Sequence, residues 1–124
     1  MSGKYDLNIR LVRFASDCID AAEKLPRSFA GMHIGSQLIR SSSSPALHYG
    51  EVQAAESTND FIHKIKVCLK ELRETFNCFL LIQIRNWLDK ATIAKLINEN
   101  NELIAIFVAS IKTAQKNREQ RMAR

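Results

Sequence analysis

A long helical repeat in the C-terminal third of the chain constrains the fold more than any other feature. Its members recur at alternating steps of four and three residues, which places them along one face of a helix. Asp89 precedes the repeat and has a side chain suited to cap a first turn, so a helix is predicted over about residues 90–119. The one polar member, Asn100, either fixes the register of packing or is partly solvated. The members are Ile93, Ile97, Asn100, Ile104, Phe107, Ile111 and Ala114.

The first half of the chain contains two further helical patterns, separated by Pro26. The first predicts a helix over about residues 5–25, which Pro26 stops. After a linker at 27–31, a second helix is predicted over about residues 32–55, kinked or loosened by Pro45. The serine run before Pro45, residues 41–44, is interpreted as small residues that let two helices approach closely. The repeating positions are Leu7, Leu11, Phe14, Cys18, Ala22 and Leu25, then Ile34, Leu38, Ala46, Tyr49 and Val52.

The longest regular stretch predicts another helix over about residues 58–86. Ser57, followed three residues later by Asp60, has the spacing of a capping box, in which the two side chains satisfy backbone donors at a helix start. Its expected core face is Phe61, Ile65, Cys68, Leu72, Phe76 and Phe79.

Four amphipathic helices with short connections define the expected architecture. Apolar residues make up 46% of the chain and charged residues 25%, with only 4 Gly and 2 Pro, which is typical of an ordinary folded protein. The 124 residues are enough for one domain, expected to span residues 1–124. Because β signals are almost absent, we predict an all-α, antiparallel up-and-down four-helix bundle. Tyr49 and Glu51 are expected to hold this bundle together.

Two stretches are apolar on every side of their helix, namely 78–82 and 104–108. A helix in an isolated bundle needs only one buried face, so this surplus favours a second face covered by another subunit. The sequence therefore predicts a homo-oligomer. The alternative is a monomer whose core is broad.

The residue types that carry catalysis do not form a recognisable constellation in this chain. His33, His48 and His63 lie far apart and form no pair with metal-ligand spacing. Glu71 and Glu74 are interleaved with basic residues, which favours a charged helix face over a tuned acid and base. The glycines form no phosphate-binding loop and the serines no nucleophile motif. We therefore expect no enzyme activity, metal or cofactor, and we interpret the cysteines as buried and structural.

No apolar run reaches the ~18 residues that a membrane span requires, and the first ten residues lack the layout of a signal peptide. The three cysteines are an odd number and include no C-x-x-C pair. A soluble protein of the reducing cytoplasm, with no membrane association, is expected.

Positive charge is concentrated in two places. The chain carries 18 Lys and Arg against 13 Asp and Glu, a net charge of +5. Within 58–86, cations repeat at steps of three and four on the side opposite the core face, which predicts a basic ridge. A second group forms a basic C-terminal tail, where cations also favour the helix dipole without any ligand. The ridge is His63, Lys66, Lys70, Arg73 and Asn77, and the tail contains Lys112, Lys116, Arg118, Arg121 and Arg124.

The middle of the chain resembles a known family. The stretch Ser41–Glu51, then Ala55-Glu56-Ser57, Asp60–Lys66 and Leu69–Thr75, is similar to the bacterial four-helix-bundle proteins encoded in 23S ribosomal RNA intervening sequences. The resemblance covers about residues 7–111 and extends to the accessory variability proteins of diversity-generating retroelements, which work beside a reverse transcriptase. It implies a homopentameric barrel with a basic surface that associates with structured RNA or DNA.

These observations together predict a nucleic-acid-binding accessory or scaffold protein. Lys66, Lys70 and Arg73 are the expected phosphate contacts, and His63 joins them when protonated. Because few aromatic residues accompany the cations, shape and charge are expected to dominate over base readout. The alternative is a protein-interaction adaptor that docks an acidic protein or a nucleoprotein such as a reverse transcriptase. For the predicted nucleic-acid-binding function, the supporting phosphate contacts are Lys112, Lys116, Arg118 and Arg121.

Overall fold

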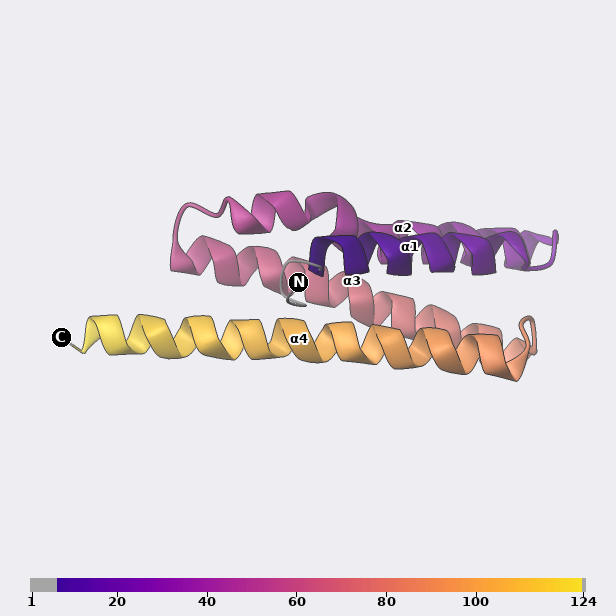
Figure 1. Ribbon diagram of the computed structural model, residues 1–124. Helices are drawn as coiled ribbons and strands as arrows, with labels where there is room; N and C mark the ends of the chain where they lie inside the picture. The colour runs from indigo at the N-terminus through magenta and orange to yellow at the C-terminus, as the bar shows by residue number, and fades with distance from the viewer. Residues whose placement is uncertain (1–6, 124) are drawn as a thin grey trace.

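The described part of the chain folds into four helices joined by three short loops (Figure 1). The structure is a computed structural model that describes residues 7–123. Over this range all of the regular secondary structure is α-helical, which confirms the predicted all-α class. The helices are α1 (Leu7–Glu23), α2 (Phe29–Gln53), α3 (Thr58–Arg85) and α4 (Lys90–Met122).

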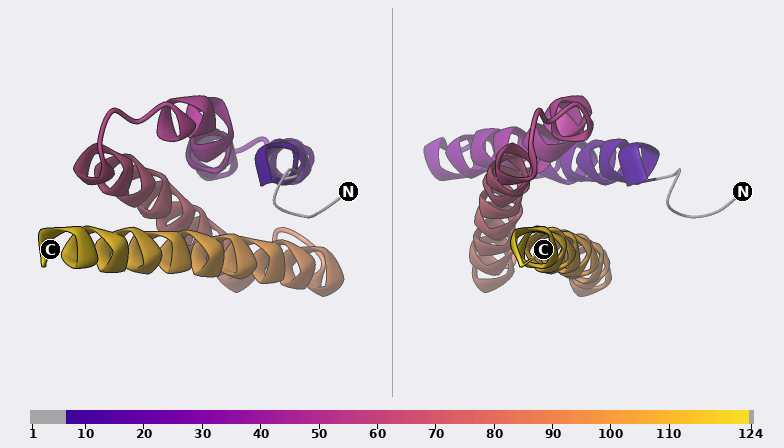
Figure 2. Two further views of the ribbon diagram at one scale, coloured as in Figure 1. Left: turned by 60° about the vertical axis from the view of Figure 1, so that its left-hand side comes forward. Right: turned by 90° about the vertical axis from the view of Figure 1, so that its left-hand side faces the viewer.

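Each helix packs along the one before it in the chain. Figure 1 shows the chain turning back at every loop, with α3 between α4 and the pair formed by α1 and α2. Contact between α1 and α4 is less extensive than the other three pairings. The left view of Figure 2 shows why, because it looks along α1 while α4 lies lengthwise. The two helices therefore cross, and they diverge away from the crossing point.

The starts of α3 and α4 are capped as the sequence predicts. Ser57 Oγ accepts a hydrogen bond from the Asp60 backbone N at 3.0 Å. Asp60 Oδ2 accepts from the Glu56 backbone N at 3.1 Å, one residue before the position that a capping box usually bonds. At α4, Asp89 Oδ2 accepts from the Thr92 backbone N at 3.1 Å. Asn86 ends α3 in the left-handed region, with φ 55°.

The predicted boundary between the first two helices is wrong by a few residues. α1 ends at Glu23 instead of residue 25, and α2 begins at Phe29 instead of residue 32. Ser28 starts α2 early because its Oγ accepts from the Gly31 backbone N at 3.1 Å. Gly31 is thus inside the helix, where a Cβ atom would collide with the Pro26 carbonyl oxygen. Residues 5 and 6 of the first predicted helix lie outside the described range.

Pro45 lies inside α2 without ending it. Proline has no N–H to donate to the carbonyl of Ser41, and Figure 1 shows α2 changing direction in its C-terminal half. Ser41 and Ser42 are buried, as close packing requires, and Ser41 Oγ lies 2.8 Å from Thr75 Oγ1 of α3. The kinked helix and the packing role of the serines both agree with the sequence interpretation.

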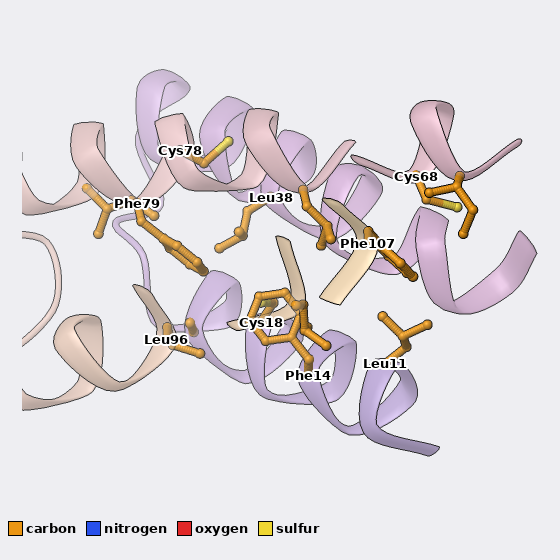
Figure 3. Close-up of a cluster of buried hydrophobic side chains, with 14 of the residues drawn as sticks. Leu11, Phe14, Cys18, Leu38, Cys68, Cys78, Phe79, Leu96 and Phe107 are labelled. Carbon is orange, nitrogen blue, oxygen red and sulfur yellow. The ribbon is translucent and has the colours of Figure 1, made fainter. Parts of the chain in front are cut away.

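The core is built around aromatic side chains from three helices. Phe14 of α1, Phe79 of α3 and Phe107 of α4 are each at most 2% exposed and point into the same interior (Figure 3). The rings of Phe14 and Phe79 meet edge to face, with centroids 6.4 Å apart.

The buried faces of α3 and α4 are offset slightly from the predicted ones. Phe61 and Phe76 are half-buried, whereas Ile62 and Thr75 are buried. On α4, Leu96 and Leu103 are buried in place of Ile97 and Ile104, which are half-buried. Each helix contacts two other helices, so the face that it buries is broader than the face buried in a two-helix coiled coil. The centre of this buried face cannot be read from heptad spacing alone.

The polar side chain of Asn100 lies in the core and links two helices. Asn100 is 0% exposed, so the solvated alternative is wrong. Its Nδ2 donates to the Leu72 carbonyl of α3 at 3.0 Å, while Oδ1 has no hydrogen-bond partner within the described chain.

Tyr49 is half-buried against Phe107, with ring centroids 6.5 Å apart. Glu51, in contrast, is exposed and lies 4.0 Å from His48 of its own helix, so it does not hold the bundle together as predicted.

Replacing Ser57 by Ala is expected to lower the free energy of unfolding by about 1 kcal/mol, because the Asp60 N–H then loses its acceptor. Urea unfolding followed by circular dichroism measures the change. The control is Ser16→Ala, since Ser16 is exposed in the middle of α1 and alanine is a better helix former there. Equal destabilisation by both substitutions would show that the cap contributes nothing specific.

Candidate nucleic-acid interface

The predicted basic ridge forms a continuous exposed face of α3. His63, Lys66, Lys70, Arg73 and Asn77 are all exposed. The opposite side of the helix faces the core and contains Ile62, Ile65, Cys68, Leu72 and Phe79. From residue 63 to residue 73 the helix rises about 15 Å, at ~1.5 Å per residue. The structure therefore brings the four predicted α3 cations into one line.

The two acidic residues interleaved with the ridge, Glu71 and Glu74, are paired with a cation of another helix. Arg40 of α2 binds Glu71 Oε2 through Nη1 at 2.8 Å and Glu74 Oε2 through Nη2. The hydrogen bond to Glu74 is the main reason why the pKa of Arg40 is raised above its usual value. Within residues 7–123 no carboxylate pairs with Lys66, Lys70 or Arg73. The ridge charge is therefore not cancelled locally.

Asp60, at the start of α3, is also engaged elsewhere. Its Oδ2 accepts from Lys64 Nζ at 3.0 Å. This bond is the largest reason why the pKa of Asp60 lies below its usual value, and the Glu56 backbone N–H adds to it. Asp60 therefore stays ionised at neutral pH and serves the helix cap.

The basic C-terminal residues are part of α4, which extends to Met122, so the described part of the predicted tail is helical. Lys112 and Lys116 are exposed. Arg118 Nη1 instead donates to Asn59 Oδ1 at 2.8 Å, and Arg121 Nη2 donates to Thr58 Oγ1 at 2.5 Å.

Because Asn59 lies one turn before His63 on α3, Arg118 reaches the N-terminal end of the ridge. Two of the predicted contacts thus also tie α4 to α3. Arg124 lies outside the described residues.

Metal and thiol chemistry have little geometric basis in the described chain. Among residues 7–123, no group of three or more His, Cys, Asp and Glu side chains could hold a metal ion. Cys18, Cys68 and Cys78 are free and buried, as predicted. Burial raises the pKa of Cys18 to about 12, against a smaller lowering by a hydrogen bond with Ser42. This thiol is therefore protonated at neutral pH and is a poor nucleophile.

A groove of about 980 Å³ lies between α1 and α4, where the two helices cross. Side chains of both signs line it, including Arg13, Asp17 and Lys95. Arg10 bridges it, donating to Glu99 at 2.7 Å and to Glu102 at 2.9 Å. Four basic and three acidic residues line the groove, so neither sign of charge dominates it.

Sequence reasoning missed Arg10 and Arg40, each of which binds two glutamates of a neighbouring helix. The only local signal is that the two glutamates within each pair, 71/74 and 99/102, lie one turn apart.

None of the helices within residues 7–123 is long and apolar enough to cross a membrane.

The described residues form a small all-α protein in which Lys66, Lys70 and Arg73 are exposed along one face of α3. The model of the family described as 23S rRNA-intervening sequence protein matches residues 7–109, and the chain belongs to this family. The match contains the whole ridge and ends before Lys112.

Among solved structures, the chain is similar to a crystal structure from Bacteroides thetaiotaomicron VPI-5482, described as a protein with unknown function from the S23 ribosomal protein family. The TM-score is 0.78 at 23% identity, over 85% of this chain and 97% of that one. At this identity the likeness shows the fold. No curated protein matches the sequence.

Proposed function

We propose that this protein is a nucleic-acid-binding accessory or scaffold protein that catalyses no reaction. Lys66, Lys70 and Arg73 contact the phosphates of structured RNA or DNA, and His63 adds a contact when it is protonated. The C-terminal cations, defined as Lys112, Lys116, Arg118 and Arg121, support them.

The observation that carries the proposal is the line of exposed cations on α3 with no paired carboxylate in the described chain. A linear array of this kind can follow a phosphate backbone, and every neutralised phosphate releases bound counterions. No Phe, Tyr or Trp side chain belongs to the ridge, so stacking on bases is expected to contribute little. Binding should depend on the shape of the nucleic acid and on salt. The family's name, which refers to an intervening sequence of 23S rRNA, makes a structured RNA the first probe.

The proposal includes the antiparallel up-and-down bundle and its assembly into a homopentameric barrel. Of the stretches expected to be covered by another subunit, Leu81 is 39% exposed, and Ile104 and Val108 are half-buried. More apolar surface lies on α1, where Ile9 and Val12 are each 47% exposed and Ile19 is 37% exposed. Their spacing places them on one side of α1, which supports association between subunits.

Light scattering after size-exclusion chromatography tests the assembly. We expect a mass about five times that of the 14.1 kDa chain. A mass near that of one chain would show that the protein is a monomer whose apolar residues are partly solvated.

Fluorescence-anisotropy titrations test the proposed function directly. The probes are an RNA hairpin, a DNA duplex and a single strand, each at about 50 and 200 mM salt. Micromolar or tighter binding that weakens steeply with salt is the expected result, and the ranking of the probes identifies the preferred shape. If no probe binds at the lower salt, the proposal is wrong. The ridge would then be better interpreted as an adaptor surface for an acidic protein or a nucleoprotein such as a reverse transcriptase.

A further inference from the structure

We propose that Arg40 is a positioning residue that keeps the ridge cation Lys70 available by holding Glu74 and Glu71 in ion pairs with α2. This inference rests on the proposed function, since it concerns the same ridge. Arg40 itself belongs to α2 and acts through the two carboxylates.

The guanidinium of Arg40 is fixed by three side chains. Nε donates to Gln37 Oε1 at 3.2 Å within α2. Nη1 binds Glu71 at 2.8 Å and Nη2 binds Glu74, so one planar group spans two carboxylates one turn apart. The Glu71 side chain is 14% exposed, and the Glu74 side chain is 37% exposed.

A buried side-chain contact next to these ion pairs fixes the alignment of α2 along α3. Ser41, the next residue after Arg40, lies with its Oγ 2.8 Å from Thr75 Oγ1, and Thr75 follows Glu74. Both residues are at most 1% exposed. Arg40 is therefore held opposite its two glutamates by packing as well as by charge.

Without Arg40, Glu74 has a competing partner on its own helix. Lys70 and Glu74 are four residues apart, the spacing at which opposite charges pair on a helix surface. Lys66 and Arg73 have no acidic residue three or four positions away. If Glu74 were released from Arg40, it would pair with Lys70 and neutralise the central cation of the ridge.

The test compares Arg40→Met with Arg10→Met by anisotropy titration of an RNA hairpin. Arg10 is a matched control because it also binds two glutamates one turn apart, Glu99 and Glu102, but on α4 and away from the ridge. Both variants lose one positive charge and two interhelical ion pairs. Arg40→Met is expected to weaken binding by about threefold to tenfold and to lower the salt slope by the equivalent of about one neutralised phosphate, whereas Arg10→Met changes little.

A second variant separates positioning from direct phosphate contact. Arg40→Met combined with Glu74→Gln has the net charge of the natural chain and lacks the competitor of Lys70. Its affinity is expected to return to within about twofold of the natural protein. If the double variant binds as weakly as Arg40→Met, Arg40 contacts the nucleic acid itself and the inference is wrong.

Lysine acylation followed by mass spectrometry tests the same inference without nucleic acid. Pairing with Glu74 would shield the Lys70 amine, so the reaction rate of Lys70 relative to that of Lys66 is expected to fall in Arg40→Met and to stay the same in Arg10→Met. An unchanged ratio of the two rates would overturn the inference. If the ratio changes while the natural protein binds no probe, the electrostatic role of Arg40 stands and the proposed function fails.

Discussion

Replacing Lys66, Lys70 and Arg73 together by Glu is expected to lower the affinity for a structured RNA by about a hundredfold or more at ~50 mM salt. Each substitution removes a cation that is exposed and unpaired in the described chain and places a repelling charge on the same line. The salt dependence should change too, because the slope of log affinity against log salt falls by roughly 0.7–0.9 for each phosphate that the protein no longer neutralises. Anisotropy titrations over a range of salt give both quantities.

A matched triple variant controls for net charge. Arg27, Lys90 and Lys95 are exposed. Arg27 lies in the loop between α1 and α2, and the other two lie in the first two turns of α4. The first and third loops are at the same end of the molecule (Figure 1). Their replacement by Glu changes the total charge by the same amount, but we expect less than a tenfold loss of affinity. Equal losses in the two triple variants would mean that binding depends on overall charge, and the assignment of the site to the ridge would be wrong.

Replacing Phe79 by Ala is expected to lower the free energy of unfolding by about 3–5 kcal/mol. The side chain is 0% exposed, and its ring meets that of Phe14 edge to face at 6.4 Å. The substitution removes the buried ring and leaves a cavity among three helices. Because a domain is typically stable by about 5–15 kcal/mol, this loss is a large share of the total. Equilibrium urea unfolding monitored by circular dichroism measures it.

The chain contains a control with the same chemistry at an exposed position. Phe29, at the start of α2, is 100% exposed. Phe29→Ala should change the free energy of unfolding by less than about 0.5 kcal/mol. A loss of several kcal/mol at Phe29 would show that this side chain is covered, and a small loss at Phe79 would contradict the packing of the core.

The four helices could be predicted because their signals are local. Apolar spacing, the Ser57 and Asp89 caps and the breaks at Pro26 and residues 86–89 each depend on residues close in sequence. The start of α2 could not be placed correctly because Gly31 is typical of a linker, although it is required inside the helix by the nearby Pro26 carbonyl. The centre of each buried face also depends on where the neighbouring helices lie, so Leu96 and Leu103 could not be chosen over Ile97 and Ile104.

The candidate site divides in the same way. The exposure of Lys66, Lys70 and Arg73 follows from their spacing on one helix, and the structure agrees with that prediction. The ion pairs of Arg40 and the bond of Arg118 to Asn59 depend on the register between helices. A register of this kind is set by packing across the whole bundle, and no short stretch of sequence contains it.

The bond from Asn100 to the Leu72 carbonyl has a consequence for how this surface can change. It joins α4 to the backbone of α3, so the pairing of the two helices at that point does not depend on which side chains α3 carries on its outside. Substitutions on the outer face can therefore accumulate while the helices keep their alignment. This property makes α3 a suitable place to graft a new recognition surface.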